Sequence, residues 1–350
     1  MFICDRGFEA QSRGLMATAA VKVDVRVISA GKFRRYAHLS ALQHLTVPHV
    51  VTRNTADVFR VGKGVMQSIQ IIRRFNPDIV FAKGGFVCLP VTIAAKLRRI
   101  PLVIHDSDTR PGLTNSIISR WADAIATGTP LDNYPYDPAI SHYTGVPIGE
   151  HFTPVSPERQ SLLKQKLGFP ADEPLVVATG GGLGAKSINE GMIAAIDQLR
   201  THKVNAYIVT GKGHYDDVVS KSPKSKRLKI TPFVYEHMVE VLGAADIVVC
   251  RGSATTPQEL AGLKKAVVIV PAHQLSDQVK NAEVFKAAEA GVVLDNQALI
   301  TSPEILGAAL IELINNPAER KRLAENLHSF ARPHAARDVA ELIERTARRS

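Results

Sequence analysis

Short apolar, β-branched runs alternate along this chain with longer segments of helical periodicity. This alternation restricts the choice of folds, because near-continuous apolar strands separated by helices indicate parallel sheets covered on both faces. The runs predict strands at residues 23–30, 77–84, 101–107, 124–129, 175–181, 205–211, 246–250, 266–271 and 292–295. Helices are predicted near residues 58–75, 90–98, 112–122, 186–200, 237–245, 256–263 and 277–290.

A boundary between two domains is predicted within residues 145–172, because GVPIGEHFTPVSPERQ is rich in Pro and Gly and a new strand pattern follows it. A length of 350 residues is enough for two domains. We expect two Rossmann-like domains, residues 1–150 and 151–350, facing each other across a cleft, the second with a helical C-terminal tail. Such sheets bind ligands at the carboxyl ends of their strands, so function is sought in the turns that follow strands.

The formal net charge of +10 fits anionic membrane surfaces, phosphorylated substrates or nucleic acid. Only 6% of the residues are aromatic and no nucleic-acid-binding motif is recognisable, so we expect no nucleic acid partner. The three cysteines lie far apart without the spacing of a zinc site, which favours free thiols in a reducing compartment. We expect neither a membrane-spanning helix nor a signal peptide.

One strand-to-helix turn, TGGGLGAKSIN (179–189), has the composition of an anion site. Its consecutive glycines let the backbone approach a ligand, and the N-terminus of the next helix offers free N–H groups, an arrangement that suits a pyrophosphate. A tight turn that simply needs glycine is the plainer explanation.

Two further polar turns follow strands of the second half. In CRGSATTPQE (250–259), Thr255 or Thr256 can cap a helix, and Glu259 lies in its first turn, where it could hold ribose hydroxyls. In SDQVKNA (276–282), polar residues at helical spacing share a face and suit the hydroxyls of a sugar. Helix capping and an ordinary solvated first turn are the respective alternatives.

Two turns of the first half are also candidates. In IHDSDTRPGLTN (104–115), His105 and Asp106 stand at a strand terminus and could act as a base and its partner, although a terminal histidine is more often structural. The DxD pattern from Asp106 to Asp108 is short, and the sheet architecture argues against a metal site there. KGGFVCLP (83–90) is a second candidate anion cradle.

These turns together resemble the MurG family over nearly the whole chain, through RGFEAQ, KGGFVCLP, IHDSDTRPGLTN, YTGVP, TGGGLGAKSIN, CRGSATTPQELAGLKKAVVIVP and SDQVKNA in this order. The resemblance implies the GT-B fold and transfer of N-acetylglucosamine from UDP-N-acetylglucosamine to undecaprenyl-pyrophosphoryl-MurNAc-pentapeptide (lipid I) in peptidoglycan synthesis. It also implies inversion at the sugar carbon, no cofactor and no catalytic metal.

The resemblance also implies roles for individual residues. His105 and Asp106 would be catalytic, and Gly84, Gly85, Asp108 and Asn115 would face the lipid acceptor. The residues on the donor side would be Gly180, Gly181, Gly182, Gly184, Arg251, Ala254, Thr255, Thr256, Glu259, Asp277, Gln278 and Asn281.

The sequence departs from the family pattern at several of these turns. Asp106 stands where the family has glutamate, Asp108 where it has asparagine, and Gly149 where an arginine is usual. The first segment corresponds to what normally follows the family's first strand and glycine-rich loop. Because that strand is central in a Rossmann-type sheet, we expect unpaired strand edges in the middle of the N-terminal sheet. An upstream segment or another chain would supply the element.

The leading hypothesis is therefore a peripheral enzyme on the cytoplasmic face of the cell membrane, active in cell-wall biogenesis and cell division together with other cell-wall synthesis proteins. Residues 56–75 mix basic and apolar side chains and are the candidate membrane-facing surface, unless they form an ordinary amphipathic helix packed on the sheet. A non-catalytic GT-B protein that binds a nucleotide sugar and a UDP-N-acetylglucosamine epimerase are the alternatives.

Overall fold

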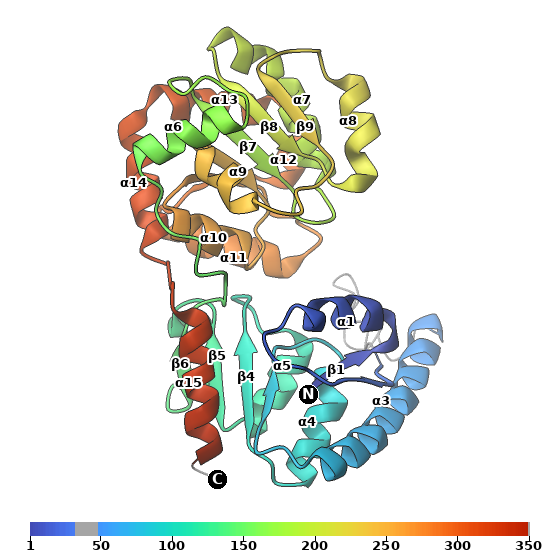
Figure 1. Cartoon of the computed structure of the whole chain (residues 1–350). Coiled ribbons are helices and arrows are strands. Elements are labelled where there is room, and N and C mark those ends of the chain that lie inside the picture. The colour runs from blue at the N-terminus through green and yellow to red at the C-terminus, as the bar shows by residue number, and fades with distance from the viewer. Residues whose placement is uncertain (32–47, 349–350) are drawn as a thin grey trace.

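The chain forms two α/β domains with parallel sheets, as the sequence predicts (Figure 1). The structure is a computed structural model and describes residues 1–31 and 48–348. The strand pairs of these residues are all parallel. None of the helices in the described part of the chain is long and apolar enough to cross a membrane.

The C-terminal domain contains a six-stranded sheet in the order β12-β11-β10-β7-β8-β9. Its strands are β7 (Leu175–Thr179), β8 (Asn205–Val209), β9 (Leu228–Thr231), β10 (Ile247–Cys250), β11 (Ala266–Ile269) and β12 (Val292–Val293). Its helices are α6 (Pro157–Lys166), α7 (Lys186–Thr201), α8 (Tyr215–Lys221), α9 (Met238–Ala244), α10 (Thr256–Leu263), α11 (Ser276–Ala287), α12 (Asn296–Thr301), α13 (Glu304–Asn315) and α14 (Pro317–His328).

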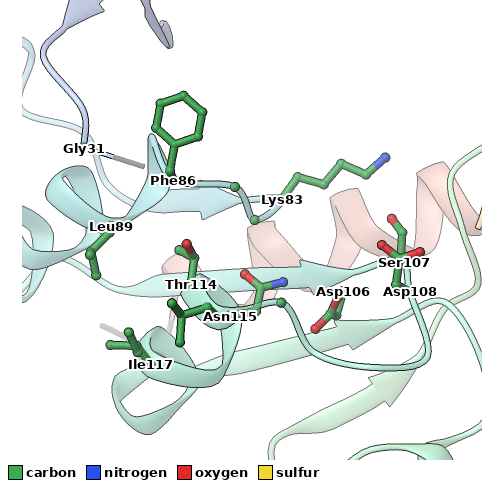
Figure 2. Close-up of a pocket in the computed structure, with 14 residues that line it drawn as sticks. Gly31, Lys83, Phe86, Leu89, Asp106, Ser107, Asp108, Thr114, Asn115 and Ile117 are labelled. Carbon is green, nitrogen blue, oxygen red and sulfur yellow. The ribbon is translucent and has the colours of Figure 1, made fainter. Parts of the chain in front are cut away.

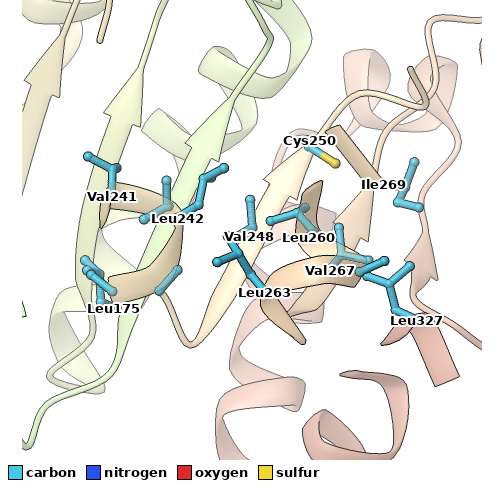
Figure 3. Packing of buried hydrophobic residues seen from close by; sticks show 14 of the residues in the cluster. Leu175, Val241, Leu242, Val248, Cys250, Leu260, Leu263, Val267, Ile269 and Leu327 are labelled. Atoms are coloured by element: carbon cyan, nitrogen blue, oxygen red, sulfur yellow. The ribbon is translucent and has the colours of Figure 1, made fainter. Parts of the chain in front are cut away.

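Both faces of this sheet are buried, which explains why its strands are continuous apolar runs. Val248 and Val267 point to one face and pack with Leu260 and Leu263 of α10 (Figure 3). The alternate strand residues point to the other face, where α7 and α13 cover them. Since successive side chains of a strand point to opposite faces, each residue of the run needs to be apolar.

The N-terminal domain has its strands in two separate sheets. Its elements are β1 (Phe2–Asp5), α1 (Glu9–Ala17), β2 (Val25–Ile28), α3 (Pro48–Phe75), β3 (Val80–Ala82), α4 (Cys88–Leu97), β4 (Leu102–Asp106), α5 (Leu113–Ile118), β5 (Ala124–Thr127) and β6 (Ser141–Tyr143). A two-stranded sheet pairs β1 with β2, and a four-stranded sheet has the order β3-β4-β5-β6. Within the described residues β1 pairs only with β2, and β3 pairs only with β4.

The last helix, α15 (Ala335–Arg348), belongs structurally to the N-terminal domain. Val339 and Leu342 pack against Val103, Ala124 and Ala126 of β4 and β5. In Figure 1 this helix runs down the side of the lower domain, although the sequence assigns the whole helical tail to the C-terminal domain. The apolar spacing of α15 predicts a helix but not the sheet that it covers.

Candidate active site

The strand order of the C-terminal sheet reverses between β10 and β7. The helix after β7 covers one face of the sheet and the helix after β10 covers the other. At such a reversal the two following loops diverge and leave a crevice at the carboxyl ends of the strands, where α/β proteins bind ligands. The two loops here are residues 180–185 and 251–255, so the sequence-predicted donor turns lie side by side.

The loop after β7 has a backbone path that excludes side chains. A Cβ on Gly180 would lie 2.1 Å from the Ala185 backbone nitrogen, and Gly181 and Gly184 have positive φ angles of 75° and 78°. Helix α7 follows at Lys186 without a side-chain cap, so its first N–H groups remain free to bind an anion. A tight turn explains the glycines, and the uncapped helix is what favours an anion site.

In the loop after β10, the side chain that caps helix α10 is not the one that the sequence predicts. Thr255 is the N-cap residue of α10, but its side chain makes no capping bond. Instead, the Thr256 N–H donates to the Ser253 hydroxyl over 3.4 Å. The prediction that a threonine hydroxyl caps this helix is therefore wrong. Arg251 lies beside the glycine loop and donates from Nη2 to the Gly184 carbonyl over 3.4 Å.

Glu259 lies in the first turn of α10 and is half-buried. Burial raises the pKa of its carboxyl group above the usual value. Within residues 1–31 and 48–348 no hydrogen bond or ion pair reaches this carboxylate. A half-buried carboxylate without a partner is costly in a folded protein, which makes Glu259 a strong candidate for contact with a ligand.

The polar residues of α11 have different environments. Gln278 accepts a hydrogen bond at Oε1 from the Ala272 N–H over 3.0 Å. Burial and the nearby Asp108 raise the pKa of Asp277. Asn281 is 3% exposed and bonds to Thr109 and Asp108 of the N-terminal domain. The structure thus brings this helix against the loop that follows β4.

A cavity of about 390 Å³ lies at the carboxyl ends of β3 and β4 in the N-terminal domain. Figure 2 shows its lining side chains. All the predicted acceptor-side residues line it, together with one predicted catalytic residue: Gly84, Gly85, Asp108, Asn115 and Asp106. The sequence motifs after two different strands therefore converge on one cavity.

Asp106 is the best placed base in this cavity. It is 4% exposed, and the Tyr136 hydroxyl donates to its Oδ2 over 2.7 Å. Burial raises the pKa of Asp106 to about 6, against the hydrogen bonds from Tyr136 and Asn115, which lower it. A general base is most effective when its pKa lies near the working pH, so this environment suits proton abstraction at neutral pH.

His105 does not fit the catalytic role predicted for it. It is 0% exposed, and its Nε2–H donates to the Gly145 carbonyl over 2.9 Å. Its Nδ1 then accepts from the Ser107 hydroxyl over 3.2 Å, so both ring nitrogens are occupied. Burial lowers the pKa of His105 to about 4. The neutral ring ties β4 to the Gly145 turn.

Several residues of the site have no place among the predicted roles. Lys83 lines the cavity directly before the glycine pair, and burial lowers its pKa while Asp108 opposes that shift. Figure 2 shows its side chain extending toward the loop that carries Ser107 and Asp108. The KGG motif contains this lysine, whereas no sequence signal links Tyr136 to Asp106.

An aromatic pair beside the glycine loop was also not predicted. The Phe233 ring lies 3.9 Å from the position of a Cβ on Gly182, and Phe233 and Tyr235 pack edge to face. The Lys212 ammonium lies 5.0 Å from the Tyr235 ring centroid. An exposed aromatic surface next to an anion site is suited to a nucleotide base.

Two parallel-sheet domains, with a glycine loop at the strand reversal of one and a cavity at the carboxyl strand ends of the other, have the architecture of the GT-B fold. Residues 19–127 match the glycosyltransferase family 28 N-terminal domain, and residues 175–342 match the glycosyltransferase family 28 C-terminal domain. The chain belongs to the MurG family.

The curated relatives include three UDP-N-acetylglucosamine–N-acetylmuramyl-(pentapeptide) pyrophosphoryl-undecaprenol N-acetylglucosamine transferases. Those of Acetivibrio thermocellus and Clostridium botulinum are each 31% identical to this chain and cover 81% and 91% of it. The Geobacillus thermodenitrificans relative is 32% identical over 92% of this chain. The chain in turn spans 76%, 84% and 84% of their lengths.

Solved structures share the fold. Acinetobacter baumannii MurG superposes with a TM-score of 0.72 at 22% identity, over 97% of this chain and 93% of that one. S. aureus MnaA in complex with UDP superposes with a TM-score of 0.63 at 14% identity, over 81% and 80% of the two chains.

In the described part of the chain, no three His, Cys, Asp or Glu side chains are grouped to hold a metal ion.

Replacing His105 by Gln should change how stability depends on pH. The pKa of His105 falls from 6.5 to about 4 on folding, so the unfolded chain binds more protons between these pH values. The wild-type protein therefore loses stability as the pH falls through this window, and the variant lacks this loss. The difference in free energy of unfolding between the two should shrink by roughly 2–3 kcal/mol from pH 7 to pH 4.

Urea unfolding at both pH values measures this difference. Asp106 titrates nearby in both proteins, so most of its contribution cancels in the comparison. A difference that is independent of pH would contradict the burial of neutral His105.

Proposed function

We propose that this chain transfers N-acetylglucosamine from UDP-N-acetylglucosamine to lipid I and so forms lipid II in peptidoglycan synthesis. The observations that carry the proposal are the unpaired Glu259 carboxylate at the strand reversal of the C-terminal domain and the cavity of the N-terminal domain that contains Asp106. The names of the curated relatives describe the same transfer.

The donor would bind to the C-terminal domain. Glu259 accepts hydrogen bonds from the two ribose hydroxyls, which satisfies its carboxylate. The free N–H groups at the start of α7 and the Arg251 guanidinium meet the charge of the diphosphate. The uracil base of UDP lies against the Phe233 ring, beside the glycine loop.

The acceptor would enter the N-terminal cavity. Asp106 removes the proton from the attacking sugar hydroxyl, whose oxygen then bonds to the anomeric carbon of N-acetylglucosamine. The bond from that carbon to the UDP oxygen breaks, UDP leaves with the electron pair, and the configuration inverts. Helix N-termini and backbone N–H groups stabilise the leaving diphosphate, with no cofactor or catalytic metal in this proposal.

The two alternative functions have less support. A non-catalytic nucleotide-sugar-binding protein would not require a buried carboxyl group with a pKa of about 6 in the opposing cavity, and Asp106 is such a group. The likeness to a solved UDP-N-acetylglucosamine 2-epimerase has a TM-score of 0.65 at 13% identity and concerns the fold alone.

The membrane-facing surface would be the exposed side of α3. Its opposite side packs on α4 and β2, as an amphipathic helix does. The exposed side carries apolar Val58, Phe59 and Met66 beside basic Arg60 and Lys63. Apolar side chains that insert among headgroups, with cations around them, favour an anionic lipid surface. Docking on the cytoplasmic face of the membrane would bring the N-terminal cavity close to its lipid acceptor. It would also bring the enzyme close to the proteins of cell division and to other cell-wall synthesis proteins.

The enzyme should release UDP from UDP-N-acetylglucosamine only when a soluble lipid I analogue is present. Asp106→Asn keeps the shape of the side chain but removes the base, so kcat should fall by about 10²- to 10⁴-fold. UDP affinity of the variant, measured by titration calorimetry, should stay unchanged. No turnover by the wild-type protein would refute the transferase proposal, and full activity of the variant would refute the role of Asp106.

Glu259→Ala should weaken UDP binding by about 1–3 kcal/mol, because the ribose hydroxyls lose a charge-assisted partner. Titration calorimetry with UDP measures this loss directly. Glu312→Ala, an exposed substitution on α13, serves as the matched control and should leave the affinity unchanged. Equal UDP affinity of the Glu259 variant and the control would remove Glu259 from the donor site.

The protein should sediment with vesicles that contain phosphatidylglycerol but not with purely zwitterionic vesicles. The Phe59 side chain is 74% exposed, and Phe59→Ser should lower vesicle partitioning by roughly tenfold or more. Val219→Ser, at an exposed apolar residue of the C-terminal domain, should have no effect. Equal loss in both variants would argue against docking through α3.

A further inference from the structure

The Asn281 side chain makes four hydrogen bonds, and three of them cross to the N-terminal domain. Its Oδ1 accepts from the backbone N–H and from the hydroxyl of Thr109, each over 2.8 Å. Its Nδ2 donates to Asp108 Oδ1 over 2.9 Å and to the Gly252 carbonyl over 3.1 Å. Thr109 and Asp108 belong to the N-terminal domain, whereas Gly252 follows β10 in the C-terminal domain.

These bonds use the full capacity of the amide. A side-chain amide has two N–H donors and one oxygen with two lone pairs, and all four are engaged here. Asn281 and Thr109 are also almost completely buried, at 3% and 7% exposure. In this arrangement the amide has nothing left to offer a sugar hydroxyl.

Asn281 nevertheless lies where a side chain could bind the donor sugar. It lies on α11 one turn after Gln278, and its Nδ2 bonds to the loop that follows β10 at the strand reversal. Asp108, its partner in the other domain, lines the N-terminal cavity. The amide therefore lies between the strand reversal of the C-terminal domain and a residue that lines the N-terminal cavity.

We propose that the Asn281 amide is an interdomain latch, and that the donor sugar opens it by taking over the bonds that Thr109 and Asp108 now make. This inference rests on the proposed function, because it assigns the sugar of the donor as the competing ligand. Thr109 and Asp108 act as positioning residues, since they control Asn281 without touching the reacting atoms.

The latch should affect the affinity for UDP-N-acetylglucosamine but not the affinity for UDP. UDP binds at the strand reversal without a sugar and leaves the latch closed. UDP-N-acetylglucosamine binds well only to the fraction of molecules whose latch is open, so its apparent affinity is reduced by that fraction. A substitution that weakens the latch should therefore strengthen binding of the sugar nucleotide and not of UDP.

Thr109→Val tests this inference, because valine keeps the shape and the backbone N–H but loses the hydroxyl bond to Asn281. UDP-N-acetylglucosamine should bind roughly 3- to 10-fold more tightly to the variant, the factor for one net hydrogen bond, while UDP affinity stays constant. Thr92→Val is the matched control, since Thr92 is a buried threonine of α4 whose hydroxyl bonds only within its own helix. It should leave both affinities unchanged.

Hydrogen exchange at the Thr109 amide gives a second readout. In the unliganded protein this N–H donates to Asn281 and should exchange slowly, and UDP should not alter that protection. UDP-N-acetylglucosamine should remove the protection, as should Asn281→Ala without any ligand. In the Asn281→Ala background, Thr109→Val should no longer affect affinity for the sugar nucleotide.

The results distinguish this inference from the function on which it rests. If wild-type protein binds UDP and Thr109→Val leaves the affinity for UDP-N-acetylglucosamine unchanged or weaker, the latch is refuted and the donor site stands. If wild-type protein binds neither UDP nor UDP-N-acetylglucosamine, the proposed function fails and the latch fails with it.

Discussion

Strands β7 and β10 pair in parallel, and the helices that follow them lie on opposite faces of the sheet. Because both loops leave from the same edge in opposite directions, the backbone opens there without any side chain needing to move aside. The glycine loop, the uncapped start of α7 and the carboxylate of Glu259 all depend on this one pairing. The strand order thus creates the place for the proposed donor site, and the individual residues then determine which ligand it binds.

Burial acts in opposite ways on two neighbouring residues of β4. It lowers the pKa of His105 and raises the pKa of Asp106, since it disfavours the charged form of each. Adjacent residues of a strand point to opposite faces, so His105 points toward the Gly145 turn while Asp106 lines the cavity. One strand therefore supplies both a structural neutral ring and a carboxyl group suited to proton transfer.

The sequence predicts the buried parts of the fold well and the half-buried parts poorly. Strands such as β7 and β10 are apolar runs with both faces covered, and their glycine- and threonine-rich ends indicate the donor side directly. The short strands β6 and β9 are half-buried edges with polar residues, so they give no such signal. The bonds of Asn281 to Thr109 join residues 172 positions apart, and only the folded chain brings them together. The sequence places His105 at the end of a strand and so predicts a catalytic role, but it does not show that both ring nitrogens are occupied.

The packing of α15 on the N-terminal sheet means that the polypeptide passes between the domains twice, once near Gly145 and once near Arg332 (Figure 1). The two passages touch, because a Cβ on Gly145 would lie 2.5 Å from Arg332 Cβ, and the Arg332 guanidinium stacks 4.3 Å from the Tyr143 ring centroid. Because both covalent crossings lie together, any change in the relative orientation of the two domains must pivot near Gly145 and Arg332.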